Sequence, residues 1–321
     1  SGKGELNLDG GELTLAQANT GLNAAVNIAA AAQANLNAVN GLGTGDIRND
    51  GKLVLSNTQG NFANNLSGQT GRVDLINNSA VYLSGDNRQY SGLFSTAAGS
   101  SLTASHADQL GNSSVQNDGV LHLNTDTTWA FTNQVSGSGD IIKNGKGTLQ
   151  LTDSHVSAGN TLVENGLLQL GGDKPVTSVT VGDMDGYRNP VVTVVNNVVS
   201  LTSNVAVSIQ GTIGGYGRVN GNVSNAGRII MPHALTGSSF ADFTINGNYS
   251  GKDGSMLIFD TVLAGDNAAT DRLVITGNAD GSSKVTVHNI GGHGGDTADG
   301  IKIIDIAGQS GANFELEGRV V

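Results

Sequence analysis

Five charged residues near the beginning of the chain have side chains suited to acid–base chemistry. They are Asp46, Arg48, Asp50, Arg72 and Asp74. A polysaccharide lyase needs clustered carboxylates that bind calcium, and an Arg or Lys base on the same face. The separation of Asp50 and Asp74 is not clearly one repeat of the pattern described below, and no catalytic motif frames them. We therefore interpret all five as solvated turn residues.

Nucleophilic, metal and cofactor chemistry find little support. Ser154 and His155 are adjacent, so on a strand their side chains would point to opposite faces and make a poor dyad. No two histidines have the spacing of metal ligands, and His288 and His293, which flank a glycine-rich loop, read as surface residues. The absence of cysteine removes thiol nucleophiles and zinc–thiolate sites. We predict no catalytic residue, no metal site and no cofactor, and hence a protein that is not an enzyme.

Two stretches interrupt the regular pattern and are predicted as loops, 182–190 and 291–300. Residues 291–299 (GGHGGDTAD) resemble one calcium-binding nonapeptide repeat. That motif works in tandem copies whose neighbouring turns share each ion, and here a single copy carries Ala at the apolar position. We interpret it as a loop.

The composition excludes several classes of protein. The 321 residues include 16 basic and 27 acidic ones, which gives a net charge of −11, and the footprint of a nucleic-acid binder is missing. At 37% hydrophobic residues the chain can bury a core, so general disorder is excluded. With 48 glycines and 13% charged residues, the surface must consist of Asn, Ser, Thr, Asp and Gly. That profile is typical of a long β protein with many turns. Neither end resembles a signal peptide or a tail, and we expect a fragment of a longer polypeptide.

A short pattern recurs along the chain: a glycine, one residue, then apolar-x-apolar. The alternation is the two-residue period of a strand with one buried face. Glycine, in two copies within Asn-Asp-Gly, is expected to supply the positive φ of a tight turn. Copies lie at 4–8, 11–15, 49–55, 71–75, 117–123, 147–151 and 165–170.

The spacing of these copies predicts the architecture. The step in residue number is 20 from Leu53 to Val73, 21 from Val81 to Leu102, and 19 from Leu102 to Leu121. A period near 20 built from very short strands indicates a solenoid. We predict an all-β fold, a right-handed parallel β-helix with three short strands per coil. The alternative is a β-sandwich or barrel of hairpins, which would show equally long alternating runs around two-residue turns.

Three local features need their own interpretation. Apolar residues within 22–39 lie at helical spacings, which allows either a short helix packed on the solenoid or irregular strands. Trp129 and Phe131 are expected in the core, with a partly exposed aromatic that stacks on a sugar as the alternative. The longer alternating runs 255–262 and 284–290 suggest hairpin-like β structure that caps the C-terminal end.

Three segments carry a resemblance to a known family. Residues 136–172 (SGSGDIIKNGKGTLQLTDSHVSAGNTLVENGLLQLGG) resemble the passenger-associated repeat of bacterial autotransporters. Residues 211–230 resemble the start of the family's C-terminal passenger region, and 271–277 (DRLVITG) match a signature within it. Residues 300–321 resemble the end of the passenger in pertactin-like autotransporters.

The resemblance implies a passenger domain of a Gram-negative bacterium, exported through the translocation barrel of the same precursor to the cell surface, where it stays or is released. It also implies that the C-terminal passenger region folds first and templates the rest, as an autochaperone. A solenoid coil cannot bury its apolar face alone, so growth from a stable end is physically reasonable. We expect a β-helix over 1–210 and a C-terminal β-helix and autochaperone region over 211–321.

Function is then expected along the side of the solenoid. Stacked coils place equivalent turn residues in rows, and such rows of amides and carboxylates suit self-association between neighbouring cells. The candidates for self-association are Asn49, Asp50, Asn77, Asn78, Asn117 and Asp118. Host glycans or matrix proteins are the alternative partners, with Arg48, Arg72 and Arg88 as candidates for ligand binding. A polysaccharide-degrading enzyme is a third reading. A fourth is a stalk and autochaperone that lack the functional tip.

Overall fold

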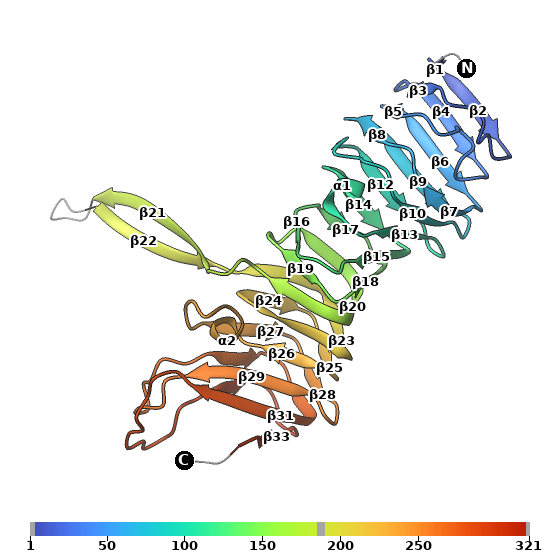
Figure 1. Cartoon of the computed structure of the whole chain (residues 1–321). Coiled ribbons are helices and arrows are strands. Elements are labelled where there is room, and N and C mark those ends of the chain that lie inside the picture. The colour runs from blue at the N-terminus through green and yellow to red at the C-terminus, as the bar shows by residue number, and fades with distance from the viewer. Residues whose placement is uncertain (1–3, 185–189, 319–321) are drawn as a thin grey trace. The chain divides into compact units, whose positions relative to one another are not determined.

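The computed structural model describes the backbone of residues 4–184 and 190–318, and their side chains outside 176–197. Almost every described element is a strand (Figure 1). The described residues form two short helices, α1 (Ala107–Leu110) and α2 (Pro232–Thr236). The predicted all-β class is confirmed. The chain divides into two compact units. Unit 1 contains 1–149 and 155–166, and unit 2 contains 150–154 and 167–321.

Unit 1 is built from three sets of parallel strands. Sheet A consists of β1 (Glu5–Leu8), β3 (Ala25–Ile28), β5 (Ile47–Asn49), β8 (Leu66–Gly68) and β11 (Gln89–Tyr90). The β2 row consists of β2 (Gly11–Leu15), β4 (Ala32–Leu36), β6 (Lys52–Ser56), β9 (Arg72–Ile76), β12 (Leu93–Thr96), β14 (Ser114–Asn117) and β17 (Val135–Ser136). The β7 row consists of β7 (Gln59–Phe62), β10 (Ala80–Leu83), β13 (Ser101–Ala104), β15 (Val120–Asn124), β18 (Asp140–Asn144) and the middle of β20 (Val156–Leu170). β16 (Trp129–Phe131) pairs with β19 (Thr148–Leu151).

Each strand of these rows pairs in parallel with the equivalent strand one repeat further along the chain. We call the stretch between two such partners a coil. Leu53 pairs with Val73, Val81 with Leu102, and Leu102 with Leu121. These are the spacings read from the sequence, so the predicted repeat is confirmed in register. Parallel pairs need a long connection, which the rest of each coil supplies. The alternative with hairpin-linked strands is wrong for these rows.

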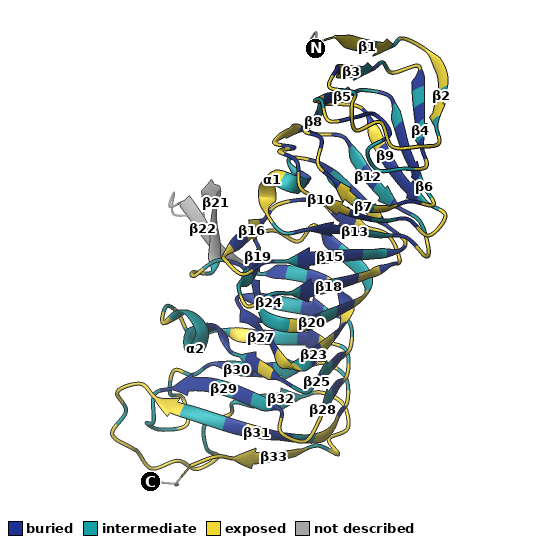
Figure 2. Cartoon of the chain, turned by 45° about the vertical axis from the view of Figure 1, so that its right-hand side comes forward, coloured by how far each residue is buried: buried dark blue, intermediate teal, exposed yellow. Residues whose placement is uncertain are grey.

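The core of unit 1 lies between the sheets. Val73, Phe94 and Val115 are register partners on β9, β12 and β14, and all are buried. Side chains alternate along each strand, so every second residue joins this interior, as the alternation of colours in Figure 2 shows. Trp129 and Phe131 are buried and meet edge to face, with ring centroids 5.5 Å apart. Their predicted place in the core is confirmed.

The stretch 22–39 forms strands and no helix. β3 and β4 lie within it and pair with β1 and β2. Val26 and Ile28 are buried, as are Ala32, Ala34 and Leu36, which is the period of two of a strand. The helical spacing arose because two short strands and their turn placed apolar residues three or four apart. Of the two readings, the strand reading is confirmed.

The Asn-Asp-Gly turns owe their glycine to crowding. A Cβ on Gly51 would lie 2.2 Å from the carbonyl oxygen of Ala29, and one on Gly119 would lie 2.2 Å from that of Ser100. Neither glycine has a positive φ, so that expectation is wrong for this motif. The expectation is confirmed in the copies at 11–15 and 165–170, where Gly11 and Gly166 have positive φ, and among the described non-glycine residues positive φ occurs at Asn57, Asn77 and Asn78. The stacking of one coil on the next therefore selects Gly51 and Gly119.

Unit 2 also consists mainly of parallel strands, most of them as short as those of unit 1. Its elements are β23 (Val199–Gly215), β24 (Gly217–Asn220), β25 (Val223–Asn225), β26 (Arg228–Ile230), β27 (Asp242–Asn246), β28 (Tyr249–Gly251), β29 (Met256–Thr261), β30 (Arg272–Ile275), β31 (Ala279–Asn289), β32 (Ile304–Ile306) and β33 (Asn313–Leu316). Val199 is in register with Gly217, whereas Leu273 is in register with Ile304, which lies much further along the chain. Coils therefore lengthen toward the C-terminal end, because loops and α2 are inserted between strands.

Two expectations for unit 2 have different outcomes. The runs 255–262 and 284–290 lie mostly on β29 and β31, which pair in parallel, so their predicted hairpin is wrong. An antiparallel hairpin is present where a loop was predicted, since β21 (Val176–Met184) pairs with β22 (Pro190–Asn197). Residues 185–189 of that predicted loop lie outside the described residues. The predicted loop at 291–300 is confirmed.

The predicted domain boundary and the character of the helices remain to be compared with the structure. The predicted boundary between 210 and 211 falls within β23, and it stays a prediction. Among the described residues, no helix has the length and apolar character needed to cross a membrane.

Candidate binding surface

The outer face of sheet A carries a row of polar side chains. Parallel register places Asn7, Asn27, Arg48, Ser67 and Gln89 side by side across five strands. Two shallow hollows lie on this face, of about 340 Å³ and 310 Å³. The polar residues that line the first are Asp46, Asn65, Ser67, Asp86, Arg88 and Gln89, and those that line the second are Asn7, Asp9, Asn27, Arg48 and Asp50.

Each of the three candidate arginines is paired with a nearby aspartate on its own strand or turn. Arg48 Nε lies 2.9 Å from Asp50 Oδ2, and Arg72 Nε lies 2.8 Å from Asp74 Oδ1. Arg88 Nε donates to Asp86 Oδ1 at 2.9 Å, and this hydrogen bond is the main reason why the pKa of Asp86 falls to about 2. These exposed guanidinium groups are therefore largely neutralised by their neighbours. To a ligand, these guanidinium groups would therefore contribute mainly directed hydrogen bonds and little net positive charge.

The structure does not bring all three arginines together. Arg48 and Arg88 line the hollows of sheet A, whereas Arg72 lies on β9 in the β2 row. There Arg72 is the register partner of Lys52, and both reach the carboxylate of Asp74. The five residues weighed for lyase chemistry are therefore divided between two sets of strands.

The two predicted Asn-Asp turns are locally alike. Asn49 and Asn117 are buried, and each donates Nδ2 to a carbonyl oxygen in the next coil, of Arg72 at 3.0 Å and of Asp140 at 2.8 Å. Asp50 accepts from the backbone N–H of Gln69, and Asp118 from that of Ser138. These hydrogen bonds from the next coil lower the pKa of both carboxyls.

These turns do not form one row. The turn at Asp50 follows β5 of sheet A, whereas the turn at Asp118 follows β14 of the β2 row, so they lie at different corners of the coil. The two turns share their local geometry, but the prediction that they occupy equivalent positions in one row is wrong. Asn49 and Asn117 are internal braces, and their side chains are not available to a partner.

The other two candidates for self-association lie on the surface. Asn77 and Asn78 are exposed at the turn between β9 and β10. Asn77 donates Nδ2 to Ser56 Oγ in the preceding coil at 2.8 Å. Four of the six candidates can therefore be reached by a partner. They are the exposed Asn77, Asn78 and Asp118, and the partly exposed Asp50.

A buried lysine was missed by the sequence reading. Lys143 occupies an inward position of the β7 row, in register between Leu123 and Val163, and has no exposed surface. Its Nζ donates to the carbonyl oxygens of Gly145, Gly147 and Asn165 at 2.6–2.8 Å. Burial lowers its pKa to about 8. The signal was present in the sequence, because Lys143 is the lysine of the Lys-x-Gly-x-Gly motif in 136–172.

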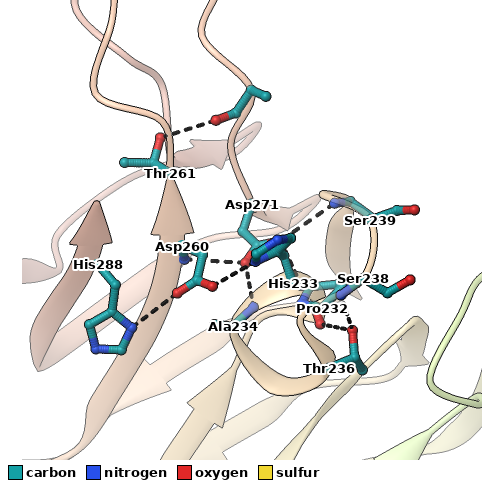
Figure 3. Close-up of polar contacts among 12 residues, drawn as sticks. Pro232, His233, Ala234, Thr236, Ser238, Ser239, Asp260, Thr261, Asp271 and His288 are labelled. Atoms are coloured by element: carbon teal, nitrogen blue, oxygen red, sulfur yellow. Dashed lines mark hydrogen bonds and ion pairs between the residues drawn. The ribbon is translucent and has the colours of Figure 1, made fainter. Parts of the chain in front are cut away.

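A second missed cluster ties several segments of unit 2 together (Figure 3). The carboxylate of Asp260 on β29 lies between two imidazoles, with His233 Nδ1 at 2.6 Å and His288 Nδ1 at 3.0 Å. Asp271 is fully buried and accepts from the backbone N–H groups of His233, Ala234 and Asp260. Burial raises the pKa of Asp271, and these hydrogen bonds oppose the rise.

The contacts of the histidine cluster are hydrogen bonds within unit 2. The described chain contains no group of three His, Asp or Glu side chains arranged to hold a metal ion. Ser154 Oγ accepts from the backbone N–H of Ser200, and His155 is exposed. His288 and His293 lie at the surface as predicted. Asp271, the first residue of the signature 271–277, therefore has a structural role as the acceptor of three backbone N–H groups.

Short parallel strands that repeat at a regular interval, with polar rows outside and an aliphatic core, define the chain as a repetitive all-β protein. Residues 217–321 match the family model described as Autochaperone Domain Type 1. The chain is 38% identical over 220 residues to the uncharacterized protein YuaQ of Escherichia coli K12, which covers 68% of this chain and 14% of that protein.

Two similar proteins are adhesins by name. The adhesin BmaC autotransporter of Brucella suis biovar 1 is 34% identical over 205 residues, which covers 64% of this chain and 5% of that protein. The autotransporter adhesin AIDA-I of Escherichia coli is 28% identical over 227 residues, with coverage of 64% and 17%. The chain therefore spans less than a fifth of the length of each of these relatives. It belongs to the passenger region of type V autotransporters, as its repeat motifs indicated.

Proposed function

We propose that this passenger region acts at the bacterial cell surface as an adhesin, through self-association between copies on neighbouring cells. The names of BmaC and AIDA-I support the adhesin part of the proposal. The observation that carries self-association is the in-register pairing of unit 1, which turns single outward side chains into rows across the coils. One such contact contributes only about 1 kcal/mol, so binding depends on repetition. Many copies on two cell surfaces supply it as avidity.

The direct test is the settling of cells that display the chain. Cells that do not aggregate by themselves are given the passenger fused to an outer-membrane display unit, and are mixed with labelled bare cells. Aggregates that exclude the bare cells support homotypic association and the biofilm growth that would follow from it. Recruitment of bare cells, or no settling, contradicts it.

A second candidate function is the binding of a host glycan or matrix protein. The two hollows on sheet A favour it, because amide, hydroxyl and paired charged groups converge there. Since Arg48 and Arg88 are engaged by Asp50 and Asp86, we infer a preference for uncharged sugars over sulfated ones. Glycan-array binding that is lost on Gln89→Ala and Ser67→Ala would support this function. Equal binding of sulfated and neutral glycans would contradict the inferred preference.

We infer that the chain is not an enzyme. Supporting this, the charged residues weighed for lyase chemistry are separated, with Arg48 on sheet A and Arg72 on the β2 row. Both guanidinium groups are paired with aspartates. Release of unsaturated or reducing sugars from a panel of polysaccharides would contradict this inference.

We also propose that the coils form a right-handed parallel β-helix with a C-terminal cap. The parallel register of unit 1 and the lengthened coils of unit 2 support it. An electron-density map that shows left-handed winding, or strands closed into a barrel, would contradict it. Export to the cell surface and release of the passenger are tested by surface labelling and by detection of the chain in culture supernatant.

A further inference from the structure

One outward face of unit 1 is unusually apolar for a surface. Register pairing along the β7 row places Tyr82, Thr103, His122, Ile142 and Leu162 side by side. Their neighbours along each strand, such as Val81, Leu121 and Ile141, point into the core. Tyr82 is 55% exposed, His122, Ile142 and Leu162 are partly exposed, and Thr103 is buried between Tyr82 and His122 in the row. Val120, also on β15 and partly exposed, widens the row. A solvated sheet face would carry polar residues at these positions.

We call Tyr82, Val120, His122, Ile142 and Leu162 the apolar strip. Figure 2 draws β10, β15 and β18, which carry four of its five residues, in that order along unit 1, with β13 between β10 and β15. The outward positions of β7, β10, β13 and β15 hold no acidic or basic residue apart from His122. Burial lowers the pKa of His122, and the nearby carboxylate of Glu164 opposes this shift. The charged outward residues beside the strip are Asp140, which is the register partner of Val120, and Glu164 on β20.

The charge of the chain restricts what can cover this face. Two copies carry a net charge of −11 each and repel at most orientations. On each copy, four aspartates and two arginines line the hollows of sheet A. A symmetric contact between two sheet A faces would therefore place the negative surface of one copy against that of the other. The apolar strip itself carries no carboxylate, so a contact through it brings fewer like charges together than a contact through sheet A, although Asp140 and Glu164 lie beside it. It also gains by removing apolar surface from water.

We propose that the apolar strip is the face through which two copies of this chain associate, each covering the strip of the other. A twofold contact uses the same patch on both partners, so an apolar strip is matched by another apolar strip. His122 is the central member of the row, with Tyr82 and Thr103 on one side and Ile142 and Leu162 on the other. Parallel and antiparallel arrangements of the copies therefore both place His122 opposite its own counterpart.

This inference rests on the proposed self-association, and the experiment separates the two. Cells display the wild-type chain, His122→Asp, His122→Lys or, as a control, Ala130→Asp, which adds the same negative charge at an exposed position of β16 outside the strip and outside the sheet A hollows. Like charges placed face to face are repelled. We expect each His122 variant alone to settle about tenfold more slowly than wild type or slower, and Ala130→Asp to settle like wild type. Far-UV circular dichroism and Trp129 fluorescence of the purified variants check that the fold is kept.

Mixing the two variants gives the decisive result. If His122 faces its counterpart, His122→Asp cells and His122→Lys cells should settle together although neither settles alone. Normal settling of both single variants, or no rescue in the mixture, overturns the strip as the homotypic face while self-association stands. Wild-type cells that fail to settle overturn self-association itself. Wild-type aggregates that recruit bare cells through the strip assign it to a different partner.

Discussion

Units 1 and 2 share parallel strands but bury different polar groups. In unit 1 the buried polar groups are mainly amides and hydroxyls that brace adjacent coils, as Asn49 and Asn117 do, together with the ammonium of Lys143 and the carboxylate of Asp74, which pairs with Arg72 and Lys52. In unit 2 two buried carboxylates, Asp260 and Asp271, join α2 to β29 and β31. Unit 1 is thus braced from coil to coil, whereas unit 2 is also cross-linked between longer insertions.

The ladders that connect neighbouring coils also differ in charge. In unit 1 several are made by carboxylates, since Asp50, Asp118 and Asp126 each accept a backbone N–H from the next coil. In unit 2 the ladder consists of asparagines, in which Asn204, Asn222, Asn248 and Asn278 accept in turn. The difference shows that the same backbone N–H group of the next coil can donate either to a carboxylate, which titrates, or to an amide oxygen, which does not. The cross-linked unit is also the one that matches the autochaperone family.

The largest effect is expected from removing residues 211–321. Unit 2 supplies most of the cross-linking, and coils of a repeat protein are stable only against a folded neighbour. We therefore expect the remaining 1–210 to lose cooperative unfolding, measured with urea by far-UV circular dichroism. The only tryptophan, Trp129, lies in unit 1 and reports that unit by fluorescence. Cooperative unfolding of 1–210 at the midpoint of the full chain would break the proposed dependence.

The substitution Asp271→Ala should be the most damaging single change. It leaves the backbone N–H groups of His233, Ala234 and Asp260 without their acceptor inside unit 2. We expect a loss on the order of 4 kcal/mol in the free energy of unfolding. Asp253→Ala, at an exposed turn, is the matched control and should have little effect. If Trp129 fluorescence shifts as much as circular dichroism, the two units unfold together.

Lys143→Met tests the buried ammonium of unit 1. Methionine fills a similar space but leaves the carbonyl oxygens of Gly145, Gly147 and Asn165 without their donor. We expect a loss of about 2 kcal/mol in urea unfolding followed at Trp129. The exposed Lys146→Met is the control. A stability equal to that of the control would show that water satisfies these carbonyls.

The smallest expected effect is on the pH dependence of stability. As the pH falls, the aspartates considered in unit 1 should lose stabilising free energy, whereas Asp271 in unit 2 should gain it. The pKa of Asp50 and Asp118 is lowered in the folded chain, so their stabilisation is complete above the unfolded value of about 3.9 and is lost as pH falls through the lowered pKa. The pKa of Asp271 is raised, so its contribution to stability increases as pH falls toward about 4.

The measurement is the urea midpoint between pH 6 and pH 3, followed at Trp129 for unit 1 and by far-UV circular dichroism for the whole chain, which includes unit 2. The double variant Asp50→Asn/Asp118→Asn should flatten the decline below pH 4, because amides do not titrate there. Asp271→Asn should remove the gain above pH 4 and leave the decline in place. An unchanged acid profile in the first variant would assign the decline to other carboxylates.

The sequence alone determined the strands and their period, for a local reason. Alternation along 53–55, 73–75 and 121–123 needs only the two-residue geometry of a strand, and the spacing of the copies follows from the length of a coil. It therefore predicted the register of Leu53 with Val73 and of Leu102 with Leu121. The repeat motif of 136–172 and the signature 271–277 predicted the family in the same way.

Only the tertiary structure decided which candidate residues are exposed together on one side of unit 1. Exposure depends on the sheet and the corner of the coil to which each turn belongs. Two identical Asn-Asp-Gly sequences lie at different corners, and their asparagines are buried. Of the three arginines predicted as ligand-binding candidates, Arg72 lies apart from Arg48 and Arg88, and each is paired with an aspartate. Lys143 is a core brace, while His122 and Ile142 became neighbours through parallel pairing. Such contacts join residues of different coils, beyond the reach of local patterns.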